Sequence, residues 1–311
     1  MNTSLYNISP IDGRYRSKTS LLSEYFSEFA LIKTRIEVEI EYLINLSEFK
    51  IKGLDVFSEK DKTALRSIYL DFNLEQALEV KELESTINHD VKAVEYFIKK
   101  SCDQLGIVFN TEFIHFGLTS QDINNTAFPM MLMRYLKNLY IPNLNKIIES
   151  LEQKAQEWSI IPLLARTHGQ PASPTTLGKE IYVFVERLKC QIKILETAQH
   201  SGKFGGATGN FNAHLIAYPE RNWNQFGAEF LEKIGLVRQK TTTQIEHYDQ
   251  MGHILDTSKR IQNILIDFSK DIWSYVSFDV FTQKINSQEV GSSAMPHKVN
   301  PIDFENAEGN L

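Results

Sequence analysis

The sequence has little cysteine and lacks a long apolar run. Its two cysteines, Cys102 and Cys190, lie 88 residues apart, and neither belongs to a C-x-x-C pair. This spacing argues against a disulfide framework and against a cysteine zinc site. No apolar run approaches the ~18 residues of a membrane-spanning helix, and the N-terminus lacks the apolar region of a signal peptide. We therefore expect a reduced, cytoplasmic protein without a membrane segment.

A block of like charge is also absent. Lysine and arginine number 33, aspartate and glutamate number 39, and the net charge is −6. Without a basic tail, non-specific nucleic-acid binding is not expected. The 311 residues are 42% hydrophobic and 23% charged, which is the balance of a globular protein with a large core and roughly two domains.

Apolar residues recur every three or four positions through most of the chain, which is the spacing of one helix face. The pattern predicts long helices over residues 21–46, 123–158, 177–195 and 251–276. Pro142 is expected to kink the second of them. Because the strict alternation of half-buried strands is scarce, the predicted fold class is all-α.

Glycine and proline interrupt this pattern at loops expected near residues 8–15, 106–110, 166–174, 202–210 and 291–301. The helices before about residue 110 are shorter than those after it. This contrast predicts a small N-terminal helical domain, residues 1–111, and an elongated long-helix bundle, residues 112–311. The sequence stops at Leu311 just after the pattern of a new helix begins, so we expect it to be a piece of a longer protein.

The most informative string is GSSAMPHKVNP, residues 291–301. Glycine, serine, proline and asparagine are what any interhelical loop uses, so composition alone indicates no more than a loop. The order of all eleven residues resembles the signature loop of the fumarase/aspartase superfamily, whose members cleave a C–N or C–O bond and release fumarate.

Further segments resemble one branch of that superfamily, the adenylosuccinate lyases, particularly their bacterial form. These segments are IDGRY (11–15), TINHDVKAVEYF (86–97), FGLTSQDINN (116–125), RTHGQPA (166–172) and TTTQIE (241–246). The resemblance extends over essentially the whole chain and implies a bundle of the fumarase/aspartase type. It also implies a homotetramer whose sites are each assembled from three subunits, and a C-terminal helical domain that this chain lacks.

The resemblance implies β-elimination of fumarate from adenylosuccinate, giving AMP, and from the succinylated ribotide SAICAR, giving AICAR. A base removes a proton from the carbon next to a carboxylate while an acid protonates the leaving nitrogen. The site must therefore stabilise a carboxylate-like intermediate with preorganised donors and cations. No metal or organic cofactor is expected. His247, Asp249 and His253 do not share a helix face in a metal-binding pattern, and no H-E-x-x-H motif occurs.

The signature loop carries suitable groups for this chemistry, namely hydroxyls, an ammonium and amides. A free serine is a weak base, and its ionisation would require a cationic, water-poor loop closed over the substrate. The resemblance assigns the general base to Ser292. It assigns substrate binding to Ser293, Lys298, Val299 and Asn300.

Eight histidines occur in the chain, and most histidines in proteins are structural or solvated. His168 stands out because it lies in the RTHGQ loop just before a long predicted helix. An imidazole titrates near working pH and can protonate a leaving nitrogen. The resemblance places the general acid at His168.

Two segments have the pattern of helix N-termini. Asp90 fits the N-cap of a helix that begins at Val91, yet Asn88, His89 and Asp90 also match the family's substrate-binding segment, with Lys92 in support. Thr119 and Asp122 similarly form a predicted capping box. Amides and hydroxyls at a helix start bind anions, and the resemblance puts substrate contacts at Thr119 and Ser120.

The remaining candidates are isolated residues. Arg14 and Tyr15 are surface residues by default, but the resemblance brings this pair to the nucleotide, where a guanidinium can grip phosphate. Gln244 and Asn306 match further substrate contacts of the family. Glu305 either orients Lys298 or a serine through an ion pair, or is a solvated helix charge. The glycine-rich stretch 201–210 has no phosphate-binding spacing and is interpreted as a helix-interrupting turn.

Two other interpretations stay open. A sister lyase acting on argininosuccinate, aspartate or malate shares the signature loop. A structural or binding relative would keep the bundle without the chemistry, although Ser292, Lys298 and His168 argue against that. The Arg14–Tyr15 and 88–90 segments favour a nucleotide substrate.

Overall fold

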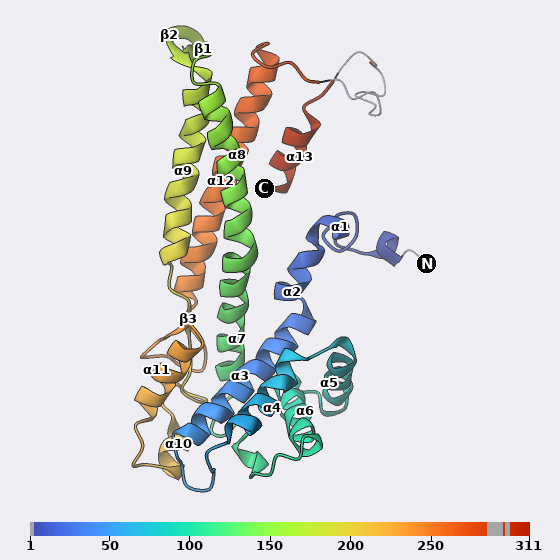
Figure 1. Cartoon of the computed structure of the whole chain (residues 1–311), viewed down its shortest axis with the longest axis vertical. Coiled ribbons are helices and arrows are strands. Elements are labelled where there is room, and N and C mark those ends of the chain that lie inside the picture. Colours follow the sequence, from blue (N-terminus) through green and yellow to red (C-terminus); the bar gives the residue numbers. More distant parts are fainter. Residues whose placement is uncertain (1–2, 285–294, 296–298) are drawn as a thin grey trace. The chain divides into compact units, whose positions relative to one another are not determined.

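The computed structural model describes residues 3–284, 295 and 299–311, and the chain divides into two compact units (Figure 1). Unit 1 consists of Met1–Tyr140 and Gln199–Met251, and unit 2 of Ile141–Ala198 and Gly252–Leu311. Unit 1 is therefore built from two stretches of sequence with part of unit 2 between them. The domain boundary at residues 111 and 112 is a different division of the chain and stays a prediction.

Unit 1 contains mostly short helices around one long central helix. They are α1 (Arg16–Thr19), α2 (Ser23–Phe26), α3 (Glu28–Glu48), α4 (Glu59–Leu70), α5 (Leu74–Ile87), α6 (Asp90–Gln104), α7 (Ser120–Tyr135), α10 (Asn212–Ala217) and α11 (Trp223–Lys233). Short 3-10 turns cover Thr3–Tyr6, Ser20–Leu22 and Thr111–Phe113, and Leu136–Tyr140 is a π-helical turn. Strands β3 (Ser201–Gly202) and β4 (Val237–Arg238) pair in parallel.

Helix α3 forms the centre of the unit 1 core, because it is apolar on most of its circumference and buried over most of its length. Tyr42 on α3 contacts the rings of Phe204, Phe226 and Phe230 at centroid distances of 5.4–6.0 Å. These three rings come from the second stretch of unit 1. Residues 199–251 therefore complete the core that residues 3–140 begin.

Unit 2 contains α8 (Ile141–Glu157), α9 (Leu177–Thr197), most of α12 (Asp249–Ser277), and α13 (Ile302–Asn310). Each long helix buries one stripe, as Leu144, Ile148, Leu151 and Ala155 do on α8. The hairpin of β1 (Pro162–Thr167) and β2 (Gln170–Thr176) connects α8 to α9 at one end of these helices (Figure 1). The rings of Phe184 and Phe268 join α9 to α12 at 5.3 Å.

The predicted helices at 177–195 and 251–276 are confirmed by α9 and α12, and the all-α class is confirmed. The helix predicted over 21–46 is instead broken at Ser27, whose side chain caps α3 by accepting from Ala30 N. The helix predicted over 123–158 is divided by the π turn. Pro142 follows that turn and has no N–H for the carbonyl four residues before it.

The loop expected at 166–174 is part of the β1–β2 hairpin, which the pattern failed to indicate. Pro162, Pro171 and Pro174 are compatible with strands here because both strands are edges of a two-stranded sheet. Among the residues that the structure describes, no helix is long and apolar enough to cross a membrane.

Candidate active site

His168 lies at the tip of the hairpin in unit 2. His168 and Gly169 have φ values of +53° and +76°, the left-handed pair that a type I′ turn requires. The Arg166 guanidinium donates to the Gly169 carbonyl at 3.3 Å and stacks 5.2 Å from the Phe278 ring centroid. The His168 side chain is exposed. The turn thus presents an imidazole to solvent.

His89 caps α6, and this corrects the sequence prediction that Asp90 is the N-cap. His89 Nδ1 accepts from the Lys92 amide at 3.1 Å, so the proton of the neutral ring is assigned to Nε2. Asp90 is instead the first residue of α6. Asn88 ends α5 in the left-handed conformation at φ +55°. An exposed His89 can therefore donate from Nε2 while its other nitrogen holds the helix start.

Buried Arg35 of α3 connects the N-terminal ends of α6 and α7. Its Nη2 donates to Asp90 Oδ2 at 2.6 Å and its Nε donates to Asn124 Oδ1 at 2.9 Å. Burial alone would raise the pKa of Asp90, but the Arg35 charge and the Val91 N–H hold that pKa below its ordinary value. We call residues 88–90 and 119–120 the helix-start pair. Amide N–H groups at a helix start attract anions.

The predicted capping box at the start of α7 is confirmed. The Thr119 amide donates to Asp122 Oδ2 at 2.8 Å, and the Asp122 amide donates to the Thr119 carbonyl at 2.9 Å. Thr119 and Ser120 are half-buried, whereas Asp122 is fully buried. The buried carboxylate therefore holds the helix start from its interior side, while Thr119 and Ser120 stay partly accessible.

The segment that carries Gln244 is connected to α7 through Asn125, a residue whose role no local sequence pattern indicates. Asn125 Nδ2 donates to Gln121 Oε1 at 2.7 Å and to Tyr248 Oη at 3.0 Å, and its Oδ1 accepts from the Glu246 amide. Gln244 itself is exposed, two residues before buried Glu246. Asn125 thus holds the segment that carries Gln244 next to the helix that carries Ser120.

The remaining unit 1 candidates lie on exposed or half-buried surface. Lys92 binds both carboxylate oxygens of Glu95 at 2.8 Å and lies 5.2 Å from the Tyr96 ring. The Arg14 guanidinium is exposed and lies 6.0 Å from the ring of Tyr15. Lys92 is therefore oriented by its own helix, and Arg14 has a cation–π partner beside it.

The signature loop is only partly described. Ser292, Ser293 and Lys298 lie outside the described residues. Val299 and Asn300 are half-exposed before α13, and Glu305 and Asn306 are exposed on it. The Asn306 side-chain oxygen accepts from Asn310 Nδ2 at 2.9 Å.

Helix α13 contacts α12 through a charged pair and an aromatic pair. Lys270 and Glu308 form an ion pair at 3.2 Å, and the rings of Phe268 and Phe304 lie 6.2 Å apart. These contacts fix α13 on α12 within unit 2.

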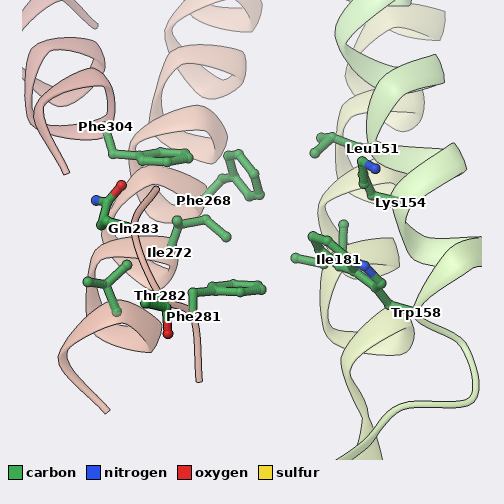
Figure 2. Close-up of a pocket in the computed structure, with 11 residues that line it drawn as sticks. Leu151, Lys154, Trp158, Ile181, Phe268, Ile272, Phe281, Thr282, Gln283 and Phe304 are labelled. Carbon is green, nitrogen blue, oxygen red and sulfur yellow. The ribbon is translucent and has the colours of Figure 1, made fainter. Parts of the chain in front are cut away.

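A pocket of about 270 Å³ lies between α8, α9, α12 and α13 of unit 2 (Figure 2). Its walls are mainly apolar, and its polar side chains are Lys154, Thr282 and Gln283. None of the predicted site residues lines it. Because the candidate residues lie elsewhere, this pocket is not taken as the candidate active site.

The structure thus gathers the candidates into two groups. Unit 1 brings the helix-start pair together through Arg35 and attaches the Gln244 segment through Asn125. Unit 2 carries His168 on its turn and Glu305 and Asn306 on α13. Within the described part of the chain, no three histidine, cysteine or carboxylate side chains are grouped closely enough to hold a metal ion.

Comparisons with known proteins identify the family of the chain. A family model described as "Lyase" matches residues 13–311. The chain is 56% identical to the adenylosuccinate lyase of Dictyostelium discoideum, over 98% of this chain and 67% of that protein. It is 46% and 44% identical to those of Haemophilus influenzae and Escherichia coli, over 99% of this chain and 68% of each relative.

A solved structure shares the fold. The 3-carboxy-cis,cis-muconate lactonizing enzyme from Pseudomonas putida superposes with a TM-score of 0.68 at 21% identity, over 93% of this chain and 62% of that one. Such low identity shows the fold alone. The chain belongs to the lyase family that the family model describes. Within it, the relatives place the sequence among the adenylosuccinate lyases, of whose length it spans about two thirds.

Proposed function

We propose that the protein cleaves adenylosuccinate to AMP and fumarate, and SAICAR to AICAR and fumarate. The observation that carries this proposal is the helix-start pair, two helix N-termini fastened together by buried Arg35. Both substrates carry a phosphate and two carboxylates, and helix starts bind such groups through backbone amides. Sequence identity of 44–56% to adenylosuccinate lyases supports the same substrate class.

In the proposed reaction, Ser292 removes a proton from the succinyl carbon that bears a carboxylate but not the leaving nitrogen. The electron pair left on that carbon is first delocalised into the carboxylate and then forms the carbon–carbon double bond of fumarate. The C–N bond breaks, and His168 protonates the nitrogen that leaves. Because the proton is weakly acidic, most of the catalytic effect must come from stabilising the dianionic carboxylate intermediate.

The other proposed contacts are assigned by type of group. Thr119, Ser120 and the 88–90 segment bind anionic groups of the substrate, and Lys298 and Asn300 stabilise the intermediate. His89 suits this role because its Nδ1 already accepts from the helix and its Nε2 is left to donate. Arg14 and Tyr15 bind the nucleotide, while Gln244, Ser293, Val299 and Asn306 complete the binding site. Lys92 and Glu305 support it.

We further propose that the working form is a cytoplasmic homotetramer with sites shared between subunits. The candidates are distributed over two units, and several are exposed on the single chain, as His168, His89 and Asn306 are. Residues that must exclude water during proton transfer are expected to be covered when the site is complete. We propose that another copy of the chain covers these residues in the assembled site.

The first test is fumarate release from adenylosuccinate, with argininosuccinate as the control substrate. The 311-residue chain is measured beside a version extended through its natural C-terminus. Release from adenylosuccinate alone supports the proposal, and the comparison of the two chains shows whether the further residues are required. Release from argininosuccinate alone would favour a sister lyase, and nucleotide binding without release would favour a non-catalytic relative.

The roles of the acid and the base are tested by substitution. Ser292→Ala should abolish turnover while helix content and assembly stay intact. His168→Ala should abolish turnover but leave substrate binding largely in place. Substantial residual turnover in the first variant would put the base elsewhere, and unchanged turnover in the second would remove His168 as the acid.

A further inference from the structure

The glycine-rich stretch 201–210 encloses one charged pair that the proposed reaction does not use. Lys203 and Asp122 are both fully buried, with the Lys203 ammonium 2.7 Å from Asp122 Oδ1. Asp122 Oδ1 also accepts from the Gly205 and Gly206 amides at 2.9 and 3.2 Å. The sequence predicted that residues 201–210 form a turn. In the structure, this turn supplies the ammonium and two amide N–H groups that donate to the Asp122 carboxylate.

The same carboxylate holds the start of α7. Its other oxygen, Oδ2, accepts from the Thr119 amide at 2.8 Å and from the Gly206 amide at 3.1 Å. Lys203 also donates to the Gly206 carbonyl, so the ammonium fixes both the carboxylate and the turn around it. A continuous set of hydrogen bonds therefore leads from Lys203 through Asp122 to the turn that carries Thr119 and Ser120.

We propose that Lys203 is a positioning residue for the substrate site, keeping Asp122 ionised so that its carboxylate holds the Thr119–Ser120 turn in its binding geometry. This inference rests on the proposed function. Lys203 is buried beneath the helix start and acts through Asp122. A buried carboxylate without its cation is favoured to take up a proton, and a protonated carboxyl loses acceptor capacity for the surrounding amides.

The reason for a lysine here follows from electrostatics. Burial lowers the pKa of the Lys203 ammonium, and the Asp122 charge opposes that change. Three backbone amides alone provide partial charges, whereas the ammonium provides the full charge that an interior carboxylate requires. The other charged or titratable groups that interact with Asp122 are Tyr42, His115, His214 and Arg238, and Glu39 is paired with His115.

The test compares Lys203→Met with the wild type in the full natural chain and its native assembly. KM and kcat for adenylosuccinate are measured at about pH 6 and about pH 8.5. In Lys203→Met, KM should exceed the wild-type value by about tenfold at the lower pH and by much less at the higher one, because low pH favours proton uptake by a buried carboxylate that has lost its cation. His115 and His214 are present in both proteins and also titrate, so the Asp122 contribution is separated from theirs by a second variant in which residue 122 cannot titrate.

The double variant Asp122→Asn/Lys203→Met is the second measurement. Its amide oxygen still accepts from Thr119 N–H but cannot titrate, so the ratio of its KM to the wild-type value should not depend on pH. It also leaves no unpaired buried charge, which preserves the test if Lys203→Met folds poorly. The matched control is Lys62→Met, which removes a lysine that pairs with Glu48 and Glu59 at the surface.

Two results would overturn the inference: unchanged KM in Lys203→Met, or an excess KM equal at both pH values. An unchanged KM with a lower kcat would indicate a smaller active fraction, which a purely structural lysine would produce. Absence of fumarate release in the wild type would instead overturn the proposed function and the inference with it. The two failures are therefore distinguishable.

Discussion

The pKa values of two buried or half-buried histidines of unit 1, His115 and His214, are shifted in opposite directions. Burial lowers the pKa of His115, but Glu39, whose Oε1 lies 2.5 Å from His115 Nδ1, outweighs burial and raises that pKa. His214 has no carboxylate partner in contact, and burial lowers its pKa to about 4. Its Nε2 lies 3.0 Å from Tyr42 Oη. The pair with Glu39 stabilises the fold at low pH, and His214 destabilises it there.

The acid sensitivity of the fold is expected to depend on His214. As pH falls from 6.5 towards 4, the unfolded chain gains a proton at this residue that the folded chain does not. The folded state should lose up to about 3 kcal/mol over this range. His214→Gln should reduce the slope of unfolding free energy against pH, measured by urea denaturation. His253→Gln, at an exposed site on α12, is the control, and equal slopes in all three proteins would contradict the assignment.

The two proposed roles of His89 are separable by substitution. His89→Asn retains a side-chain acceptor for the Lys92 amide, so the thermal unfolding midpoint should stay close to that of the wild type. Its KM for adenylosuccinate should rise about tenfold or more, because the donor at Nε2 is lost. His89→Ala should show the same rise in KM and also lose about 1 kcal/mol of stability. Wild-type KM in His89→Asn would leave His89 as a cap only.

At the scale of elements, Gly178 determines how closely α8 and α9 approach. A Cβ at this position would lie 2.1 Å from the Ala155 carbonyl oxygen, so a side chain forces the two helices apart. Gly178→Ala should destabilise unit 2 by about 1–3 kcal/mol, measured by hydrogen exchange of α8 and α9 amides. Gly252→Ala is the matched control, since nothing lies within 4 Å of its Cβ position in α12, and it should be neutral or stabilising. Equal effects of the two substitutions would contradict this account of the α8–α9 contact.

Helices with a sustained apolar stripe could be predicted from the sequence, as α9 and α12 were, because burial of one face repeats along them. Breaks that depend on single residues could not. Ser27 follows one helix and caps the next. His89, and not Asp90, caps α6 because an imidazole nitrogen can accept a hydrogen bond from a backbone N–H. The hairpin was missed because proline argues against a strand in most sheets, whereas here Pro162, Pro171 and Pro174 lie on the edge strands of a two-stranded sheet.

The candidate site shows the same limit. Thr119 and Asp122 could be predicted because a capping box is local in sequence. Arg35, Asn125 and Lys203 act across 55 to 121 residues of sequence, so no local pattern pairs them with Asp90, Glu246 and Asp122. The only signal in the sequence was a polar residue among apolar neighbours on a predicted helix, which applies to Arg35 and Asn125 but not to Lys203 in the glycine-rich stretch. Their partners required the fold.

For the whole molecule, the discontinuity of unit 1 predicts how truncated chains behave. A chain ending at residue 198 lacks Phe204, Trp223, Phe226 and Phe230, which cover Tyr42 and the C-terminal part of α3. It should show helical far-UV circular dichroism, weak near-UV signal and strong binding of a hydrophobic dye. A chain ending at residue 251 contains all of unit 1 and should give protected α3 amides. Protected α3 amides in the shorter chain would show that the first stretch folds unaided.

The division of unit 1 into two stretches also bears on how the protein is made. After residue 140 leaves the ribosome, the 111 residues from 141 to 251 must still be added before the last part of unit 1 exists. At ordinary rates of synthesis this takes roughly 5 to 20 s. Until Phe204, Phe226 and Phe230 have been made during that time, the Tyr42 face of α3 lacks its native cover. Nascent chains of this protein are thus expected to need a chaperone that shields apolar surface during those seconds, and slower translation of the intervening helices would lengthen that dependence.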